Sequence, residues 1–111
     1  MTRIAMPIID TMLSEKFEDC SFYHIYSINL GKLEAEPIIV NAQNLLLNIP
    51  EWINEWEITD VIANGMNKLS ISYFSETKIN LFVGVEINTP ERLIEDYLMG
   101  TLKSNTQNIA N

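Results

Sequence analysis

The sequence has little of what defines several classes of protein. It contains one cysteine, four glycines and four prolines among 111 residues. A single cysteine excludes a disulfide framework and a zinc site built from several thiolates. The low glycine and proline content excludes collagen-like and low-complexity chains. No apolar run approaches the roughly 18 residues of a membrane span, and the first residues lack a secretory pattern. These absences predict a soluble, cytoplasmic protein.

Positive charge is also scarce, because seven lysines and arginines stand against fifteen acidic residues, a net charge of −8. Since binding to nucleic acid needs a basic face, we expect neither nucleic acid nor an anionic membrane as a partner. Hydrophobic residues, in contrast, make up 47% of the chain, which excludes disorder and is enough for a core. We expect a single domain over residues 1–102 and a flexible C-terminal tail over residues 103–111.

Hydrophobic patterning predicts strands first and then strands alternating with helices. The apolar and β-branched runs predict five strands, at Arg3–Ile9, Phe22–Ile28, Leu33–Val40, Ile58–Ala63 and Ile79–Val85. Residues 10–19 are polar and are expected to form a loop, and residues 30–32 a glycine turn. A hairpin in the first half and crossovers in the second predict a mixed, five-stranded α/β sheet.

Three helices are expected to cover this sheet. The first begins near Asn48, with Pro50 in its first turn, and the second is short, over residues 69–74. The third has Thr89 as its N-cap and ends at Gly100. Trp52 and Trp56 are expected to pack in the core, while the choice between monomer and homodimer stays open.

Ligands of open α/β sheets collect beyond the carboxyl ends of the parallel strands. The loop over residues 10–19 and the turn Asn64-Gly65-Met66-Asn67 should meet there. The backbone amides of that turn could hold an anion at the start of the following helix. The alternative is that Gly65 only allows a tight turn.

Cys20 and His24 are the candidate metal ligands, because a thiolate and an imidazole both bind soft metals. Along a strand they would point to the same side, roughly 13 Å apart, too far to share one ion without a bulge. The alternative reading makes Cys20 a small buried side chain and His24 a half-buried strand residue.

Acid–base chemistry has few candidates. Asp10 ends the first expected strand and Asp60 lies early in the fourth, so their carboxylates are not expected to converge on metal ions as in a two-metal nuclease. The common nucleotide-binding, nucleophile-elbow and zinc-protease motifs are absent.

Five segments of the sequence, taken together and in this order, are similar to those of a known protein family. They read R-I-A-M-P-I, L-S-E-K-F-E-D-C-S-F-Y, D-V-I-A-N-G-M-N, I-N-L-F-V-G-V and L-I-E-D-Y-L-M-G-T-L. With them the chain resembles the dinitrogenase iron–molybdenum cofactor biosynthesis family, over about Arg3 to Leu102. The resemblance implies a ribonuclease-H-like fold with strand order 3-2-1-4-5 and the second strand antiparallel. It also implies non-catalytic binding or delivery of an iron–molybdenum or related metal–sulfur cluster, together with cofactor-assembly proteins.

The resemblance places the cluster between the first loop and the glycine turn, with Val85–Glu86 as a wall. The residues implied to bind the cluster are Ser14, Lys16, Phe17, Cys20, Asn64, Gly65, Met66 and Asn67. Lys16 and Lys68 would supply positive charge to an anionic cluster.

Two family motifs are altered in this chain. Ser-x-His-Phe-Gly reads Ser14-Glu15-Lys16-Phe17-Glu18, and Gly-Gly-x-Gly reads Asn64-Gly65-Met66-Asn67. The changes leave three hypotheses open: a cluster carrier, a diverged member that has lost the cluster and acts as a protein-interaction domain, and a nuclease that depends on Asp10.

Overall fold

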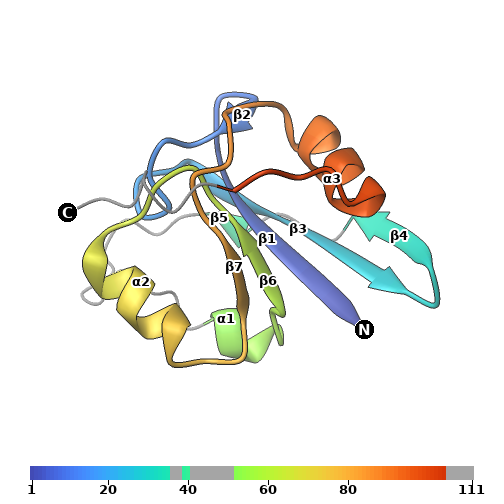
Figure 1. Ribbon diagram of the computed structural model, residues 1–111, viewed down its shortest axis with the longest axis horizontal. Coiled ribbons are helices and arrows are strands. Elements are labelled where there is room, and N and C mark those ends of the chain that lie inside the picture. The colour runs from blue at the N-terminus through green and yellow to red at the C-terminus, as the bar shows by residue number, and fades with distance from the viewer. Residues whose placement is uncertain (36–38, 41–51, 105–111) are drawn as a thin grey trace.

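A computed structural model describes residues 1–35, 39–40 and 52–104 of the chain (Figure 1). The described strands are β1 (Thr2–Ile9), β2 (Met12–Leu13), β3 (Phe22–Asn29), β4 (Lys32–Ala35), β5 (Ile39–Val40), β6 (Asp60–Ile62) and β7 (Asn80–Phe82). The described helices are α1 (Trp52–Glu55), α2 (Lys68–Ser75) and α3 (Pro90–Met99).

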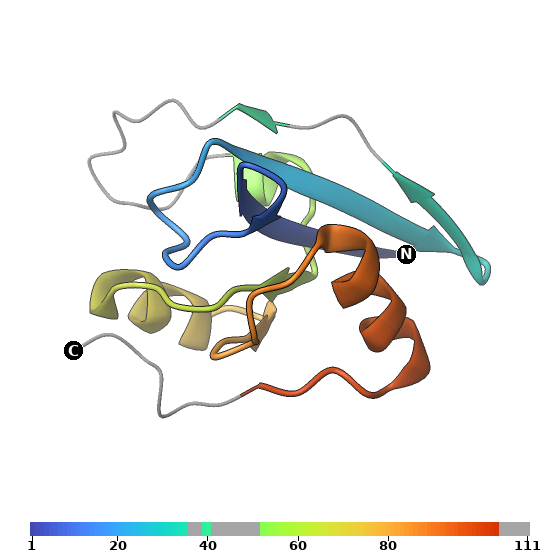
Figure 2. The same ribbon diagram turned by 90° about the horizontal axis from the view of Figure 1, so that it is seen from above.

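The strands form one mixed sheet whose main path has the order β4-β3-β1-β6-β7. Strand β3 runs antiparallel to both β1 and β4, whereas β6 is parallel to β1 and to β7. Along this five-strand path the neighbour relations follow the order 3-2-1-4-5 that the resemblance implies. The β3–β4 hairpin extends away from α2, toward the other end of the molecule (Figure 2).

The expected number of five strands is wrong, because the described sheet has seven. Strand β2 pairs with the end of β1, inside the segment expected to be a loop, and β5 pairs with the start of β3. Asp10 makes the first of these pairings feasible, because its positive φ of 56° closes a two-residue turn between Ile9 and Met12. The strand expected over Leu33–Val40 is described as β4 and β5, with residues 36–38 outside the described residues.

Each face of the sheet carries its own core. On one face, Ala5, Val61 and Tyr23 lie toward α1 and α2 and pack with Ile53 and Phe74; we call this cluster the first core. The opposite face is covered by α3 and has a second buried cluster, which includes Ile4, Met6, Ile8, Ile62, Leu93 and Ile94. Figure 1 shows α1 and α2 on one side of the sheet and α3 on the other. The apolar run of β1 is nearly continuous because both of its faces are covered.

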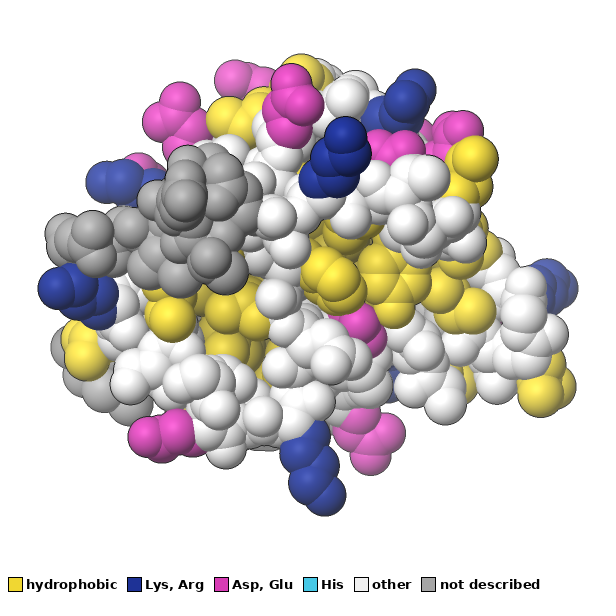
Figure 3. Space-filling model, viewed as in Figure 1, with side chains coloured by type: hydrophobic (Ala, Val, Ile, Leu, Met, Phe, Trp, Pro, Cys, Tyr) yellow, Lys and Arg dark blue, Asp and Glu magenta, His cyan; other side chains and the backbone are white. Residues whose placement is uncertain are grey.

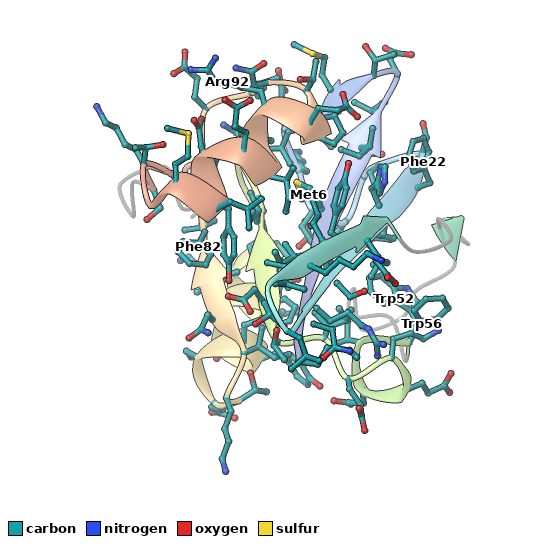
Figure 4. All side chains as sticks on the ribbon, turned by 90° about the vertical axis from the view of Figure 1, so that its right-hand side faces the viewer. Met6, Phe22, Trp52, Trp56, Phe82 and Arg92 are labelled. Carbon is teal, nitrogen blue, oxygen red and sulfur yellow. The ribbon has the colours of Figure 1, made fainter. Side chains whose placement is uncertain are left out.

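The two ends of α3 are set by residues next to them in the sequence, as predicted. Thr89 Oγ1 accepts a hydrogen bond from the Arg92 amide at 3.3 Å, and Gly100 ends the helix in the left-handed region, as expected. Trp52 and Trp56 lie on the α1 side, opposite Met6 (Figure 4), and both pack against the first core. The expected start of this helix near Asn48 lies outside the described residues, as does most of the expected tail, residues 105–111.

Candidate functional site

The loop that follows β2 is organised by Ser14. Its hydroxyl lies 2.9 Å from the carbonyl oxygens of Lys16 and Asp19, and it accepts the Lys16 amide at 3.3 Å. The Ser14 side chain is buried, and its hydrogen bonds hold the loop in shape. Lys16, in contrast, is exposed at the rim of this loop.

This loop and the turn over residues 64–67 contact each other directly, as expected. The Phe17 amide donates to the Gly65 carbonyl at 2.8 Å, and the Phe17 ring is fully buried against Tyr23 and Phe74. The Tyr23 hydroxyl donates to the Phe17 carbonyl at 2.9 Å. Burial is the main reason that the pKa of Tyr23 is raised far above its usual value, with Cys20 as a second cause. The inner wall of the site is therefore a packed, neutral core.

Glu18 occupies the position where sequence reasoning placed an anion. Its Oε2 accepts the Asn67 amide at 3.1 Å and the Ser70 hydroxyl at 2.6 Å. Asn67 is the N-cap of α2 and accepts the Ser70 amide at 2.8 Å. The start of α2 is thus capped by a side chain of the chain itself, a favourable place for a carboxylate.

The remaining residues of the turn support the sheet. The side-chain amide of Asn64 donates to the Val85 carbonyl at 2.9 Å, and the backbone carbonyl of Asn64 accepts the Gly84 amide at 2.8 Å. Met66 is buried in the first core, so its sulfur does not line an open cavity. Lys68 is exposed at the first position of α2.

The structure does not bring Cys20 and His24 together. Cys20 precedes β3 and is buried in the first core, whereas the His24 ring stacks on Tyr26 at 4.4 Å on the side of α3. Burial lowers the pKa of His24, and Glu91 acts in the opposite direction. Across the described ranges, 1–35, 39–40 and 52–104, no three His, Cys, Asp or Glu side chains form a group that could hold a metal ion.

Asp10 and Asp60 are separated, as the sequence indicated. Asp10 is exposed at the β1–β2 turn, whereas Asp60 is buried and pairs in register with Ile4. Since Asp10 follows Ile4 by six residues along the strand direction, it lies roughly 20 Å from the position of Asp60. Asp60 is held by Thr59 Oγ1 at 2.6 Å and by the Tyr97 hydroxyl at 3.1 Å, so its contacts are structural.

A pocket of about 440 Å³ opens on the outer side of the first loop; we call it the hairpin pocket. Its apolar lining is Ile9, Met12, Leu13 and Ile87, and its polar lining is Asp10, Ser14, Glu15, Lys16 and Asp19. Figure 3 shows hydrophobic side chains among acidic ones at the top of the molecule, over the β1–β2 hairpin. A second pocket of about 450 Å³ is lined by α3, by residues 85–88 before it and by residues 101–103 after it.

Sequence reasoning missed both Glu18 as the cap of α2 and the hairpin pocket. The carboxylate at position 18, where the resembled family has glycine, was the available signal for the first. No local signal indicated the second, because Ile87 lies more than 70 positions from the hairpin.

Similarity to known proteins is structural. The sequence matches no protein-family model and has no significant match among curated proteins. The crystal structure of PH0822 superposes with a TM-score of 0.79 at 19% identity, covering 96% of this chain and 97% of the other. A candidate dinitrogenase (MJ0327) from Methanocaldococcus jannaschii gives a TM-score of 0.76 at 18% identity, covering 94% of each chain. The apo form of the orange protein from Desulfovibrio gigas gives 0.76 at 15% identity, covering 96% and 94%.

The chain is therefore a small mixed α/β domain with the same fold as these proteins. None of the described helices is both long and apolar enough to cross a membrane.

Proposed function

We propose that the chain is a non-catalytic, cytoplasmic accessory module of metal–sulfur cofactor assembly, built on a ribonuclease-H-like fold. The observation that carries the proposal is the meeting of two loops, residues 14–20 and 64–67, at the carboxyl end of β1 and β6. Open α/β sheets bind their ligands at this edge. The fold shared with a candidate dinitrogenase, and with a protein solved in an apo form, supports the cofactor context.

The proposed partners are an iron–molybdenum or related metal–sulfur cluster and the proteins that assemble it. In the carrier form of the proposal, the cluster is held between the two loops, with Lys16 and Lys68 beside it. In the interaction form, the chain has lost the cluster and binds an assembly protein instead.

Glu18 favours the interaction form. Its carboxylate accepts the Asn67 amide, the donor that an anionic cluster at the start of α2 would need. A cluster would have to displace this carboxylate and would meet its negative charge. The buried Phe17 and Met66 side chains also fill the space behind the two loops.

An anaerobic titration tests the two forms. The protein is mixed with iron–molybdenum cofactor, or with a thiomolybdate–copper mixture, then desalted and analysed by visible absorbance and metal content. Retention by the unmodified protein, reduced by Lys16→Ala and Lys68→Ala, supports the carrier form. Retention only by Glu18→Gly, and not by the matched loop variant Glu15→Gly, supports a site that Glu18 has closed.

Absence of retention by every folded variant contradicts cluster binding at these loops. The interaction form then requires that a purified cofactor-assembly protein binds the unmodified chain. If that binding fails too, the proposed function as a whole is contradicted.

A further inference from the structure

The hairpin pocket has an apolar rim supplied by two separate segments. Ile9 and Met12 pair across the β1–β2 turn, and Ile87 approaches from the segment after β7. These three side chains are 42%, 37% and 36% exposed, whereas Leu13 below them is buried. A volume of about 440 Å³ lies within the roughly 300–1,000 Å³ usual for binding pockets. The pocket has room for one or two large side chains.

The charge of the pocket is negative. Asp10, Glu15 and Asp19 line it with a single cation, Lys16, which gives three negative charges against one positive charge. Within the described part of the chain, none of these four makes a salt bridge, since the two that are found join Lys32 to Glu34 and Arg92 to Asp96. The pocket therefore favours cations, as does the net charge of −8.

Backbone hydrogen bonds hold the walls in place. The Leu13 amide donates to Asn88 at 2.9 Å, which ties the hairpin to the segment that carries Ile87. The Ser14 amide donates to Pro7 at 2.8 Å, and the Ser14 hydroxyl holds the loop that carries Lys16 and Asp19. A pre-formed pocket lowers the entropy cost of binding.

We propose that the hairpin pocket docks a segment of a partner protein in which bulky apolar side chains are flanked by lysine or arginine. The apolar side chains enter between Ile9, Met12 and Ile87, and the flanking cations lie against the carboxylates of Asp10, Glu15 and Asp19. This inference rests on the interaction form of the proposed function, for which it specifies the chemistry of the partner.

Fluorescence anisotropy with three labelled hexapeptides tests the pairing of apolar and basic groups. The probe has two central leucines between pairs of lysines. One control replaces the leucines with serine, and the other replaces the lysines with glutamate. We expect each control to bind at least tenfold more weakly than the probe, and the affinity of the probe to fall as salt is added.

Variants of exposed residues locate the binding. The double variant Met12→Ser with Ile87→Ser should weaken binding of the probe about tenfold or more. Leu69→Ser, the same kind of change at an exposed position of α2, should have no effect. A triple variant should weaken binding of the probe to a similar extent and reduce the salt dependence of that binding. It combines Asp10→Asn, Glu15→Gln and Asp19→Asn. Asparagine suits the positive φ at position 10, so the turn should be preserved.

Three outcomes would overturn the inference: no binding of the probe, equal binding of the serine peptide, or binding unaffected by the pocket variants. Sedimentation that reveals a dimer dissociated by Met12→Ser with Ile87→Ser, without peptide binding, would assign the pocket to a second copy of the chain. A protein that binds a purified cofactor-assembly protein but not the peptide contradicts this inference alone. A protein that retains a cluster but binds no peptide contradicts this inference and the interaction form, and it supports the carrier form. A protein that binds the peptide but never a cluster contradicts only the carrier form.

Discussion

Glu18 ties the loop after β2 to the start of α2, although the two are far apart in sequence. We expect Glu18→Gln to lower the free energy of unfolding by about 1–2 kcal/mol, because it weakens the charge-assisted bonds to Asn67 and Ser70. Urea unfolding at pH 7 measures the difference. Glu15→Gln, an exposed change in the same loop, should alter stability by less than about 0.5 kcal/mol. Equal effects of the two changes would contradict the capping role.

His24 makes stability depend on pH in the acidic range. Burial against Tyr26 lowers its pKa below 6.5 in the folded state, so the unfolded chain binds the proton more tightly. The His24 contribution is therefore complete above pH 6.5 and is lost as the pH falls toward the lower, folded pKa.

We expect His24→Gln to remove this part of the pH dependence. The difference in unfolding free energy between the two proteins should shrink as the pH falls from 8 to 5. Acidic groups common to both proteins cancel in the difference. A difference that stays constant over this range would show that His24 does not titrate differently in the two states.

At the scale of elements, α3 ends at a backbone conformation that few residues tolerate. Gly100 has a φ of 72°, and a Cβ placed there would meet nothing within 4 Å. The cost of a side chain is therefore backbone strain alone. We expect Gly100→Ala to lower stability by about 1–2 kcal/mol and Gly100→Asn to cost less, because asparagine enters this region more readily. Thermal unfolding of both variants provides the comparison, and equal losses would contradict this explanation.

Elements with local signals could be predicted from the sequence. Thr89, Pro90 and Gly100 define α3 through contacts within a few residues, and Gly31 and Leu30 both take positive φ in the β3–β4 turn. Strand β2 could not, because a two-residue strand has no periodicity of its own and depends on the pairing of Ile8 with Leu13.

The candidate site was predictable in location but not in detail. The meeting of the two loops follows from the parallel pairing of β1 and β6. The role of Glu18 depends on Asn67, 49 residues later, and no local pattern connects them. The strand expected from Phe22 is found as β3, and Cys20 lies just before it. The burial of Cys20 in the first core, on the face opposite His24, depends on residues distant in sequence.

At the scale of the whole molecule, a partly buried hydrogen bond joins α3 to β6, an inner strand of the sheet. The Tyr97 hydroxyl donates to Asp60 at 3.1 Å, and its ring meets the Phe82 ring edge-on. Asp60 is also held by Thr59 and, at 3.4 Å, by Asn80. Tyr97→Phe should keep the ring packing and lose the bond, lowering stability by about 1 kcal/mol at pH 7.

The same bond makes the docking of α3 sensitive to alkali. Burial, followed by the Asp60 carboxylate, raises the pKa of Tyr97 to about 12, above its usual 10. The folded state thus keeps the proton longer than the unfolded chain, and the Tyr97 contribution is complete below pH 10 and is lost between pH 10 and 12.

Because Tyr23 and Tyr26 also have raised pKa values, the unmodified protein must be compared with Tyr97→Phe at each pH. We expect the stability gap between them to close over this range in urea unfolding. A gap for Tyr97→Phe that persists at pH 12 would mean that ionised Tyr97 does not release α3 from Asp60.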